Sequence, residues 1–305
     1  MIEKTIKVDK RGINKRLDLY LAFELNELTR SAIKKQIEAG NVLINGVIEF
    51  RPNYKMREDD EINCRFIIEN KSRLALVPED IPLEVIYEDD SLLAVHKPIG
   101  MVVHPATSNW QGTLLNAVLF RNNEIGKVGD PFRPGLIHRL DKDTSGIVLI
   151  GKTNEALWYY TKQFSERLIE KTYLAVVRGD FYRDYNNKEI IIDNFIGRNS
   201  INRKKFSKVP PSKGKRAITK VLWSKSLTYN NRTYSLLHVW PHTGRTHQIR
   251  VHLADMGFPI LGDKIYGRNN TYERLMLHAW KLKVALLSGE MVELVANPPE
   301  SFNKL

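Results

Sequence analysis

From Leu83 onward, stretches typical of β-strands outnumber stretches typical of helices, and the two kinds do not alternate. LEVIYEDDSLLAVHKP contains two apolar runs around a turn at Glu88 to Asp90, and further strand patterns occur at IVLIGK, KTYLAVV, AITKVLW and YSLLHVW. Two segments have helical character: TNEALWYYTKQFSERL, with Thr153 as N-cap, and RTHQIRVHLADMG, which ends at Gly257. A doubly wound fold would require regular alternation, so the pattern predicts the α+β class.

The first 70 residues have a different pattern, which predicts a small module of two helices and a hairpin. Apolar residues recur with helical spacing in LDLYLAFELNEL, and Ile33 and Ile37 share one face of a second helix. In that helix Arg30 and Lys34 are four residues apart, with Lys35 adjacent, which predicts a basic exposed surface. Asn45-Gly46, between two short apolar runs, is a strong signal for a two-residue hairpin turn.

Composition favours a cytoplasmic protein with a polyanionic partner. The sequence contains no apolar run of the roughly 18 residues that a membrane span needs and no signal peptide. The single cysteine, Cys64, cannot form a disulfide within the chain and is expected in the core. The net charge is +12, and Arg198 to Lys225 holds ten basic residues and no acidic one, which is typical of a phosphate-binding segment or of a solvated loop.

Common catalytic signatures are absent from the sequence. There is no GxxxxGKS or GKT loop, no GxGxxG after a strand, no HExxH and no GxSxG, which disfavours nucleotide hydrolysis and dinucleotide redox chemistry. The histidines lack companions at metal-ligand spacing, so we expect no metal. What remains is GLIHRLDKDTSGIVLIGKT, Gly135 to Thr153, where the DKDTSG portion is compatible with a plain turn. If the segment is extended, Arg139 and Asp141 project to the same side and place a cation and a carboxylate in one cleft.

Four stretches, in order, resemble the RluA-type family of RNA pseudouridine synthases: HKPIGMVVHP, PGLIHRLDKDTSGIVLIGKT, EKTYLAVVRG and HTGRTHQIRVHLADMGFPILGDKIYG. The resemblance extends from Leu83 nearly to the end of the sequence. In the N-terminal part, RLDLYLA, TRSAIKKQIEAGNVLING and REDDEI resemble an S4-type RNA-binding domain, a known companion of this catalytic domain. The resemblance implies a pseudouridine synthase fold with a mixed or antiparallel central sheet, preceded by a small S4-like α+β domain.

The resemblance also implies three catalytic residues. Asp141 would be the essential carboxylate, acting at the ribose C1′. Asp143 would have a structural role. Arg250 would pair with Asp141 and keep it ionised. Tyr173 would stack on the base and assist proton removal late in the reaction.

Further residues are expected to bind the RNA. Arg139 would fill the space left by the flipped uridine. His104 would line the substrate site, and His138 would either line it or have a structural role. Arg245 would contact a phosphate. Backbone contacts are expected from basic residues of both segments described above: Arg30, Lys34, Lys35, Lys204 and Lys205.

The resulting hypothesis is an RNA pseudouridine synthase acting on large-subunit ribosomal RNA, without a cofactor, as a monomer. Its domains would be residues 13–75, S4-like; 76–82, a linker; and 83–305, catalytic. The alternatives are a synthase acting on transfer RNA and a noncatalytic RNA-binding or ribosome-assembly factor.

Overall fold

The structure is a computed structural model that describes residues 2–9, 12–25, 28, 30–66, 76–105, 109–202, 205–267, 272–302 and 304. The chain forms two compact units: Met1–Leu76, to which Asp130–Arg133 are assigned, and Val77–Gly129 with Pro134–Leu305. Among the described residues no helix is both long and apolar enough to cross a bilayer.

The first unit contains the predicted helices and hairpin. Its helices are α1 (Leu17–Glu24) and α2 (Arg30–Glu38), and its antiparallel sheet has the order β1 (Ile2–Lys7), β4 (Glu61–Phe66), β2 (Val42–Ile44), β3 (Val47–Ile48). Asn45 and Gly46 both have positive φ, as the hairpin turn requires. Ile33, Ile37 and Cys64 are buried in its core.

Strand β1 was not predicted. It pairs with β4 over its whole length, so this sheet includes residues ahead of position 13, where the sequence placed the start of the domain. The local pattern IEKTIK is too short and too charged to indicate a strand without its partner.

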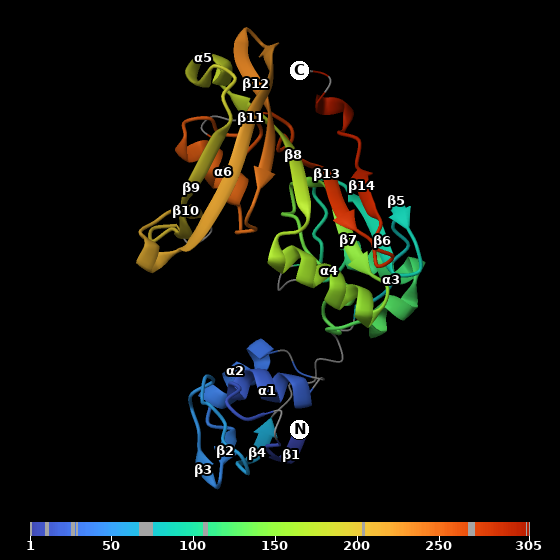
Figure 1. The fold of residues 1–305 in the computed structure, drawn as a ribbon, viewed down its shortest axis with the longest axis vertical. Helices are drawn as coiled ribbons and strands as arrows, with labels where there is room; N and C mark the ends of the chain where they lie inside the picture. The colour runs from blue at the N-terminus through green and yellow to red at the C-terminus, as the bar shows by residue number, and fades with distance from the viewer. Residues whose placement is uncertain are drawn as a thin grey trace. The chain divides into compact units, whose positions relative to one another are not determined.

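The second unit is built on one large sheet (Figure 1). Its strand path is β10-β9-β11-β12-β8-β13-β7-β6-β5, and β14 pairs with β13. The pair β13–β7 is parallel and the other described pairs are antiparallel, so the predicted α+β class with a mixed sheet is confirmed. The strands are β5 (Glu84–Glu88), β6 (Leu92–Lys97), β7 (Ser145–Gly151), β8 (Glu170–Arg178), β9 (Ile190–Arg198), β10 (Phe206–Lys208), β11 (Lys215–Tyr229), β12 (Arg232–Pro241), β13 (Leu277–Ala285) and β14 (Met291–Val295).

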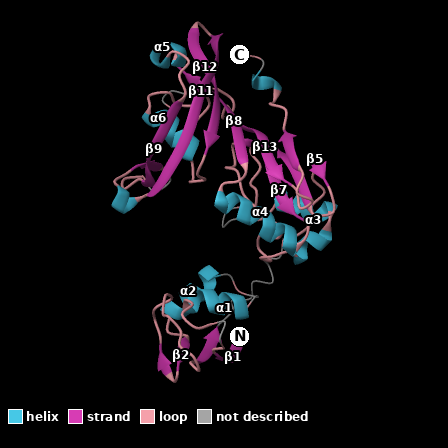
Figure 2. Cartoon of the chain, in the orientation of Figure 1, coloured by secondary structure: helices cyan, strands magenta, loops and turns pink. Residues whose placement is uncertain are grey.

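Helices lie beside both halves of this sheet (Figure 2). The α-helices are α3 (Leu114–Arg121), α4 (Asn154–Glu166), α5 (Phe181–Tyr185) and α6 (Gln248–Asp255). Short 3-10 helices occupy η2 (Asn123–Lys127), η3 (Pro211–Lys213) and η4 (Glu300–Phe302). Thr153 caps α4 by accepting a hydrogen bond from the Ala156 amide, as the sequence predicted.

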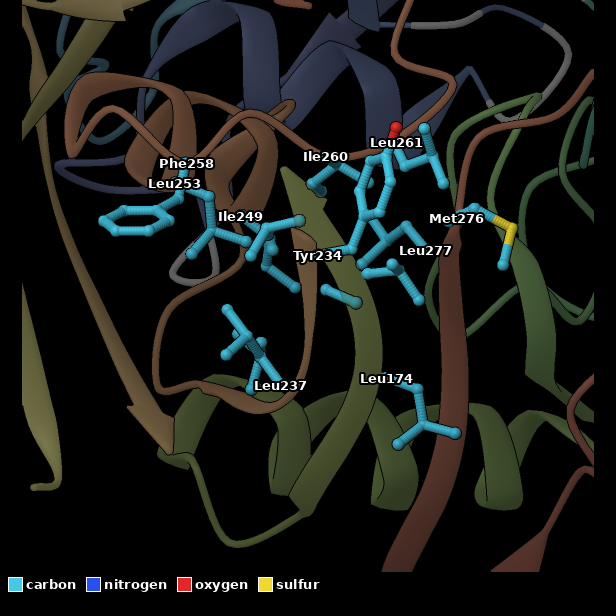
Figure 3. Close-up of a cluster of buried hydrophobic side chains, with 14 of the residues drawn as sticks. Leu174, Tyr234, Leu237, Ile249, Leu253, Phe258, Ile260, Leu261, Met276 and Leu277 are labelled. Carbon is cyan, nitrogen blue, oxygen red and sulfur yellow. The ribbon is translucent and has the colours of Figure 1, made fainter. Parts of the chain in front are cut away.

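Two apolar clusters hold helices against the two halves of the large sheet. One packs α6 and its following loop against β8, β12 and β13, with Leu253, Phe258 and Leu277 among its members (Figure 3). The other packs α4 against β6, β7 and β13, with Tyr160 fully buried. Strand β8 lies between β12 and β13, so side chains on β8 can reach groups from both halves.

Candidate active site

A cavity of about 570 Å³ lies over β8, and all three predicted catalytic side chains line it. Most of its wall comes from four places: residues 137–141 before β7, the C-terminal end of α4, the start of β8, and residues 241–250, which run from the end of β12 into α6. A volume of this size suits one small ligand or a single nucleoside.

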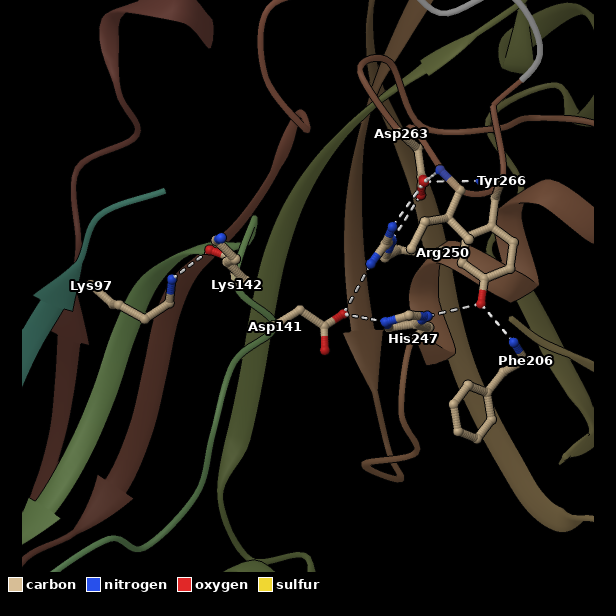
Figure 4. A network of polar contacts seen from close by, with 9 residues as sticks. Lys97, Asp141, Lys142, Phe206, His247, Arg250, Asp263 and Tyr266 are labelled. Carbon is tan, nitrogen blue, oxygen red and sulfur yellow. Dashed lines mark hydrogen bonds and ion pairs between the residues drawn. The ribbon is translucent and has the colours of Figure 1, made fainter. Parts of the chain in front are cut away.

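Asp141 lies in the tight loop that precedes β7. The Thr144 amide donates to the Asp141 carbonyl (3.1 Å), which closes the turn, and the Lys142 carbonyl accepts hydrogen bonds from the Lys97 ammonium (3.1 Å) and the Gly100 amide (3.0 Å). The backbone around Asp141 is therefore held in place. The carboxylate lines the cavity and is directed toward Arg250 and His247 (Figure 4).

Arg250, on α6, bridges two carboxylates (Figure 4). It donates from Nη1 to Asp141 at 3.4 Å, which is the pairing that the sequence predicted. Its closer partner is Asp263, which accepts from Nε at 2.8 Å and from Nη2 at 2.9 Å. Burial disfavours the charge on Arg250, but Asp263 and then Asp141 raise its pKa overall, so the guanidinium stays charged.

Asp263 was missed by the sequence analysis, because GDK there is typical of a turn. It is fully buried, and besides Arg250 it accepts hydrogen bonds from the amides of Ile265 and Tyr266. Burial opposes its charge, yet the pKa of Asp263 is lowered overall by Arg250 and these amides. The preceding Gly262 has a φ of +79°, and a Cβ there would lie 1.6 Å from the Arg274 carbonyl, so only glycine allows this turn.

His247 is the second residue that the sequence analysis missed. Its Nε2 lies 3.7 Å from the Asp141 carboxylate, and its Nδ1 lies 2.9 Å from the Tyr266 hydroxyl. That hydroxyl accepts from the Phe206 amide, so its own proton is directed to Nδ1, which leaves the Nε2 proton facing Asp141. Burial lowers the pKa of His247, with partial opposition from Asp141, and favours the neutral ring.

The loop 241–248 is locked from inside by Gln248. Its carboxamide oxygen accepts from the Thr243 hydroxyl (2.6 Å) and the Arg245 amide (3.0 Å), and its nitrogen donates to Ile218 and Thr219 on β11. These bonds fix the loop in front of α6, and His247 at its end adopts a left-handed φ of +56°. Such a backbone is uncommon for a residue other than glycine, and it recurs at functional sites.

Tyr173 lines the cavity from β8. Burial, and then the negative charge of Asp141, raise the pKa of the Tyr173 hydroxyl, which therefore stays protonated at neutral pH. The influence of Asp141 on Tyr173 agrees with the prediction that both side chains face one substrate.

The other predicted site residues are divided among three places. Arg139 and Arg245 line the cavity, and Arg245 also donates to the Arg216 carbonyl. His104 is buried and does not line the cavity. Lys205 is partly exposed at the start of the segment before β10, and Lys204 lies outside the described residues.

The basic residues predicted on α2 belong to the first unit. Arg30 donates two hydrogen bonds to the buried Asp18, which also holds Arg16. Lys34 forms an ion pair with Glu38 at 3.5 Å, and Lys35 is exposed. Arg30 and Lys34 therefore have part of their charge compensated within this unit.

His138 has a structural contact within the cavity wall. Its Nε2 accepts from the Leu149 amide (3.0 Å), its ring stacks on Phe164, and burial lowers its pKa to about 3. A neutral His138 thus attaches the segment before Asp141 to β7.

The polar side chains that line the cavity favour acid-base or nucleophilic chemistry at a carboxylate. Among the residues that the structure describes, Asp141 is the only carboxylate that lines the cavity, and no cluster of three potential metal ligands occurs. An ionised carboxylate between a guanidinium and a neutral imidazole, beside an aromatic ring, can stabilise or attack an electron-poor sugar carbon.

Comparison with known proteins agrees with this chemistry. The family model described as RNA pseudouridylate synthase matches residues 91–255, and the S4 domain model matches residues 15–62.

Relatives match over most of their length. A protein of Borreliella burgdorferi named ribosomal large subunit pseudouridine synthase D is 37% identical over 94% of this chain and 87% of its own. One of the same name from Zymomonas mobilis is 34% identical over 100% and 97%. Among solved structures, human RNA pseudouridylate synthase domain containing 1 has a TM-score of 0.60 and 27% identity, over 72% of this chain and 85% of that one.

Proposed function

Since this chain belongs to the RNA pseudouridylate synthase family and carries an S4 domain, we propose that it isomerises specific uridines of large-subunit ribosomal RNA at the cavity around Asp141. The enzyme class is that of an isomerase. The ribosomal substrate rests on the names of the relatives from Borreliella burgdorferi and Zymomonas mobilis.

The observation that carries this proposal is the Asp141 carboxylate, held in one cavity with Arg250, His247 and Tyr173. The reaction breaks the bond from C1′ to N1 of the uracil and forms a bond from C1′ to C5. Charge that develops on the sugar at C1′ needs an anion beside it, and the ionised Asp141 supplies this anion, either as a nucleophile or by assisting glycal formation. The atoms balance within one nucleotide, so no cofactor or second substrate is required.

Tyr173 would act on the base. Its ring stacks on the uracil while the base turns. In the late step the proton on C5 must leave, and N1 must gain one. The Tyr173 hydroxyl is protonated, so it can accept the C5 proton only if it passes its own proton to another base. Asp141 lines the same cavity and would be that base.

The RNA would enter the cavity with its target base flipped out. Arg139 is exposed at the rim and would occupy the vacated space, and Arg245 would contact a phosphate. Arg30, Lys34, Lys35, Lys204 and Lys205 are proposed to follow the backbone without reading sequence, and His104 to support the site from the core.

Three further points belong to this proposal. The protein would act as a monomer, with Asp141, Tyr173 and Arg250 of one chain forming the site. It would work in the cytoplasm, where ribosomal RNA is made in bacteria. The S4-like domain would extend over residues 13–75, a linker over 76–82 and the catalytic domain over 83–305.

The test compares the native chain with Asp141→Asn on unmodified ribosomal and transfer RNA transcripts. Pseudouridine is mapped by chemical labelling and primer extension, with Asp143→Asn as a matched control for loss of a nearby carboxylate. We expect modification of ribosomal RNA by the native chain and the control, and none by Asp141→Asn. Modification of transfer RNA alone would correct the substrate. Binding without modification by the native chain, on naked RNA and on ribosomal particles, would favour a noncatalytic factor.

A further inference from the structure

The cavity has more positive charge than its single carboxylate can compensate. Asp141 is the only acidic side chain among the described residues that line it. Five cationic side chains line it as well: Arg139, Arg167, Lys171, Arg245 and Arg250. Arg250 is neutralised by its two carboxylates. The other four cations have no carboxylate among the described lining residues left to pair with, so an anionic ligand can bind there.

Lys171 is one of these cations. It lies on β8, two residues before Tyr173, and the alternation of side chains along a strand puts both on the same face. Its ammonium lies 5.7 Å from the centre of the Phe164 ring and has no hydrogen bond or ion pair with any residue that the structure describes. A partly buried ammonium without a carboxylate is unfavourable, because the Phe164 ring replaces only part of the water that it loses.

Arg167 is the second. It ends α4 with a left-handed φ of +63°, unusual for a residue other than glycine, asparagine or aspartate. This conformation brings its side chain to the cavity, where its guanidinium has no partner in the described ranges either. Burial and then the charge of Arg167 lower the pKa of Lys171, so the two cations repel each other within one wall.

Stabilisation of the helix does not account for this pair. Cations near a helix C-terminus gain typically about 0.3–1 kcal/mol. Arg167 can make that contact from an exposed position, but Lys171 is on a strand and loses its hydration to reach the same wall. An anionic ligand compensates both charges.

We propose that Lys171 and Arg167 form a phosphate subsite of the cavity, which binds a backbone phosphate adjacent to the flipped uridine. This rests on the proposed function, because the ligand is a phosphate of the RNA strand. Two residues along β8 are about 6.6 Å, so a base and sugar beside Tyr173 leave a neighbouring phosphate within reach of Lys171. The hydroxyl of Thr161 on α4 lines the same wall and can donate to that phosphate.

The test combines a protein change with a phosphate change. A short RNA that contains the mapped target uridine is made with one phosphate at a time, on either side of that uridine, replaced by an uncharged methylphosphonate. Single-turnover kcat/KM is then measured for the native chain and for Lys171→Met. We expect one position at which the native chain loses about tenfold to a hundredfold, the usual size of a charge-assisted hydrogen bond.

The decisive result is the absence of additivity at that position. Lys171→Met should show a similar loss on unmodified RNA and no further loss on the methylphosphonate, because the contact is already gone. Arg167→Asn, which keeps a residue tolerant of positive φ, should do the same in smaller measure, and Lys171→Arg should regain most of the activity. Lys127→Met, an exposed lysine outside the cavity, is the matched control.

If the two losses multiply at every phosphate tested, no phosphate contacts Lys171 and the proposal is overturned. Equal activity of Lys171→Met and the native chain would overturn it too. A native chain that modifies no RNA would instead contradict the proposed function, and this outcome is visible before any variant is tested. Free inorganic phosphate serves as a further arm: competition at millimolar concentration in the native chain, lost in Lys171→Met, supports the same subsite.

Discussion

The guanidinium of Arg250 donates two hydrogen bonds, of 2.8 and 2.9 Å, to Asp263, and one, of 3.4 Å, to Asp141. The better geometry belongs to the carboxylate that the substrate cannot reach, since Asp263 is fully buried. Asp263 thereby orients Arg250 while leaving Asp141 weakly held and able to move toward a sugar carbon.

This relationship makes Asp263 a positioning residue. Asp263→Asn keeps the size of the side chain but removes the charge that compensates buried Arg250, which costs about 3 kcal/mol in unfolding free energy. We expect kcat to fall at least about tenfold and KM for RNA to change little, because Arg250 is displaced from Asp141 but the RNA-binding cations remain. Steady-state kinetics and denaturant unfolding check both. A stability loss with native kcat would show that Arg250 holds its position without Asp263.

Tyr173→Phe separates stacking from proton transfer. The ring remains, so the Kd for RNA should stay within about twofold, whereas loss of the hydroxyl should lower kcat by about a hundredfold, a typical acid-base contribution. With substrate deuterated at C5 of the target uridine, the variant should show an isotope effect larger than that of the native chain, because proton removal becomes slow. Unchanged kcat and no isotope effect would assign Tyr173 to stacking alone.

Much of the fold was predictable because its local patterns agree with its final structure. The runs that form β5, β6, β7, β8, β11 and β12 are apolar and bounded by turns, and α4 has both a cap and helical spacing. Strands β9, β10, β13 and β14 were missed. β9 is partly exposed, and β13 pairs with β8 and, in parallel, with β7, both more than a hundred residues earlier in the chain. Sequence patterns do not encode such distant pairings.

The grouping of Asp141, Tyr173 and Arg250 in one cavity was predictable, and the residues that support them were not. Asp141, Tyr173 and Arg250 lie in motifs whose resemblance assigned them. Asp263 contacts Arg250, and Tyr266 contacts His247, only because the loop that contains Asp263 and Tyr266 packs against the start of α6. Spacing along the chain cannot predict such a tertiary contact.

Lys97 anchors the loop that carries Asp141. Its ammonium is fully buried and donates to three carbonyls, those of Pro98, Met101 and Lys142. Burial lowers the pKa of Lys97 to about 7, so retaining the charge is costly, but the three acceptors match the three protons of the ammonium.

Lys97→Met should therefore leave three carbonyls without this donor. We expect a loss of about 2 kcal/mol in unfolding free energy, less than three full penalties because the buried charge is also removed. Since Lys142 adjoins Asp141, kcat should fall as well. Thermal unfolding and single-turnover assays are the measurements, with exposed Lys283→Met as control. Full activity of Lys97→Met would show that the turn at 141–144 keeps its conformation without the Lys97 ammonium.

Two buried histidines predict how stability depends on pH. His252 contacts Thr219 and Asn194, and His278 contacts Ser145 and the Ala296 carbonyl. In the neutral ring Nε2 donates to its oxygen partner and Nδ1 accepts from the neighbouring hydroxyl, so both ring nitrogens are satisfied without a charge. Burial lowers the pKa of each to about 4, from an ordinary value of 6.5.

Between pH 6.5 and 4 the unfolded chain binds a proton at each histidine and the folded chain does not. The unfolding free energy therefore falls on acidification through this window, and this part of the stability is fully present only above pH 6.5. At pH 5 the loss is about 2 kcal/mol for each ring, from about 1.4 kcal/mol per pH unit. Urea unfolding at pH 7, 6 and 5 measures it. His252→Gln should lower the unfolding free energy at pH 7. It should also remove the share of the pH dependence that one histidine contributes, because glutamine supplies a donor and an acceptor that do not titrate. An equally steep dependence in the variant would mean that His252 takes up its proton while the protein is folded.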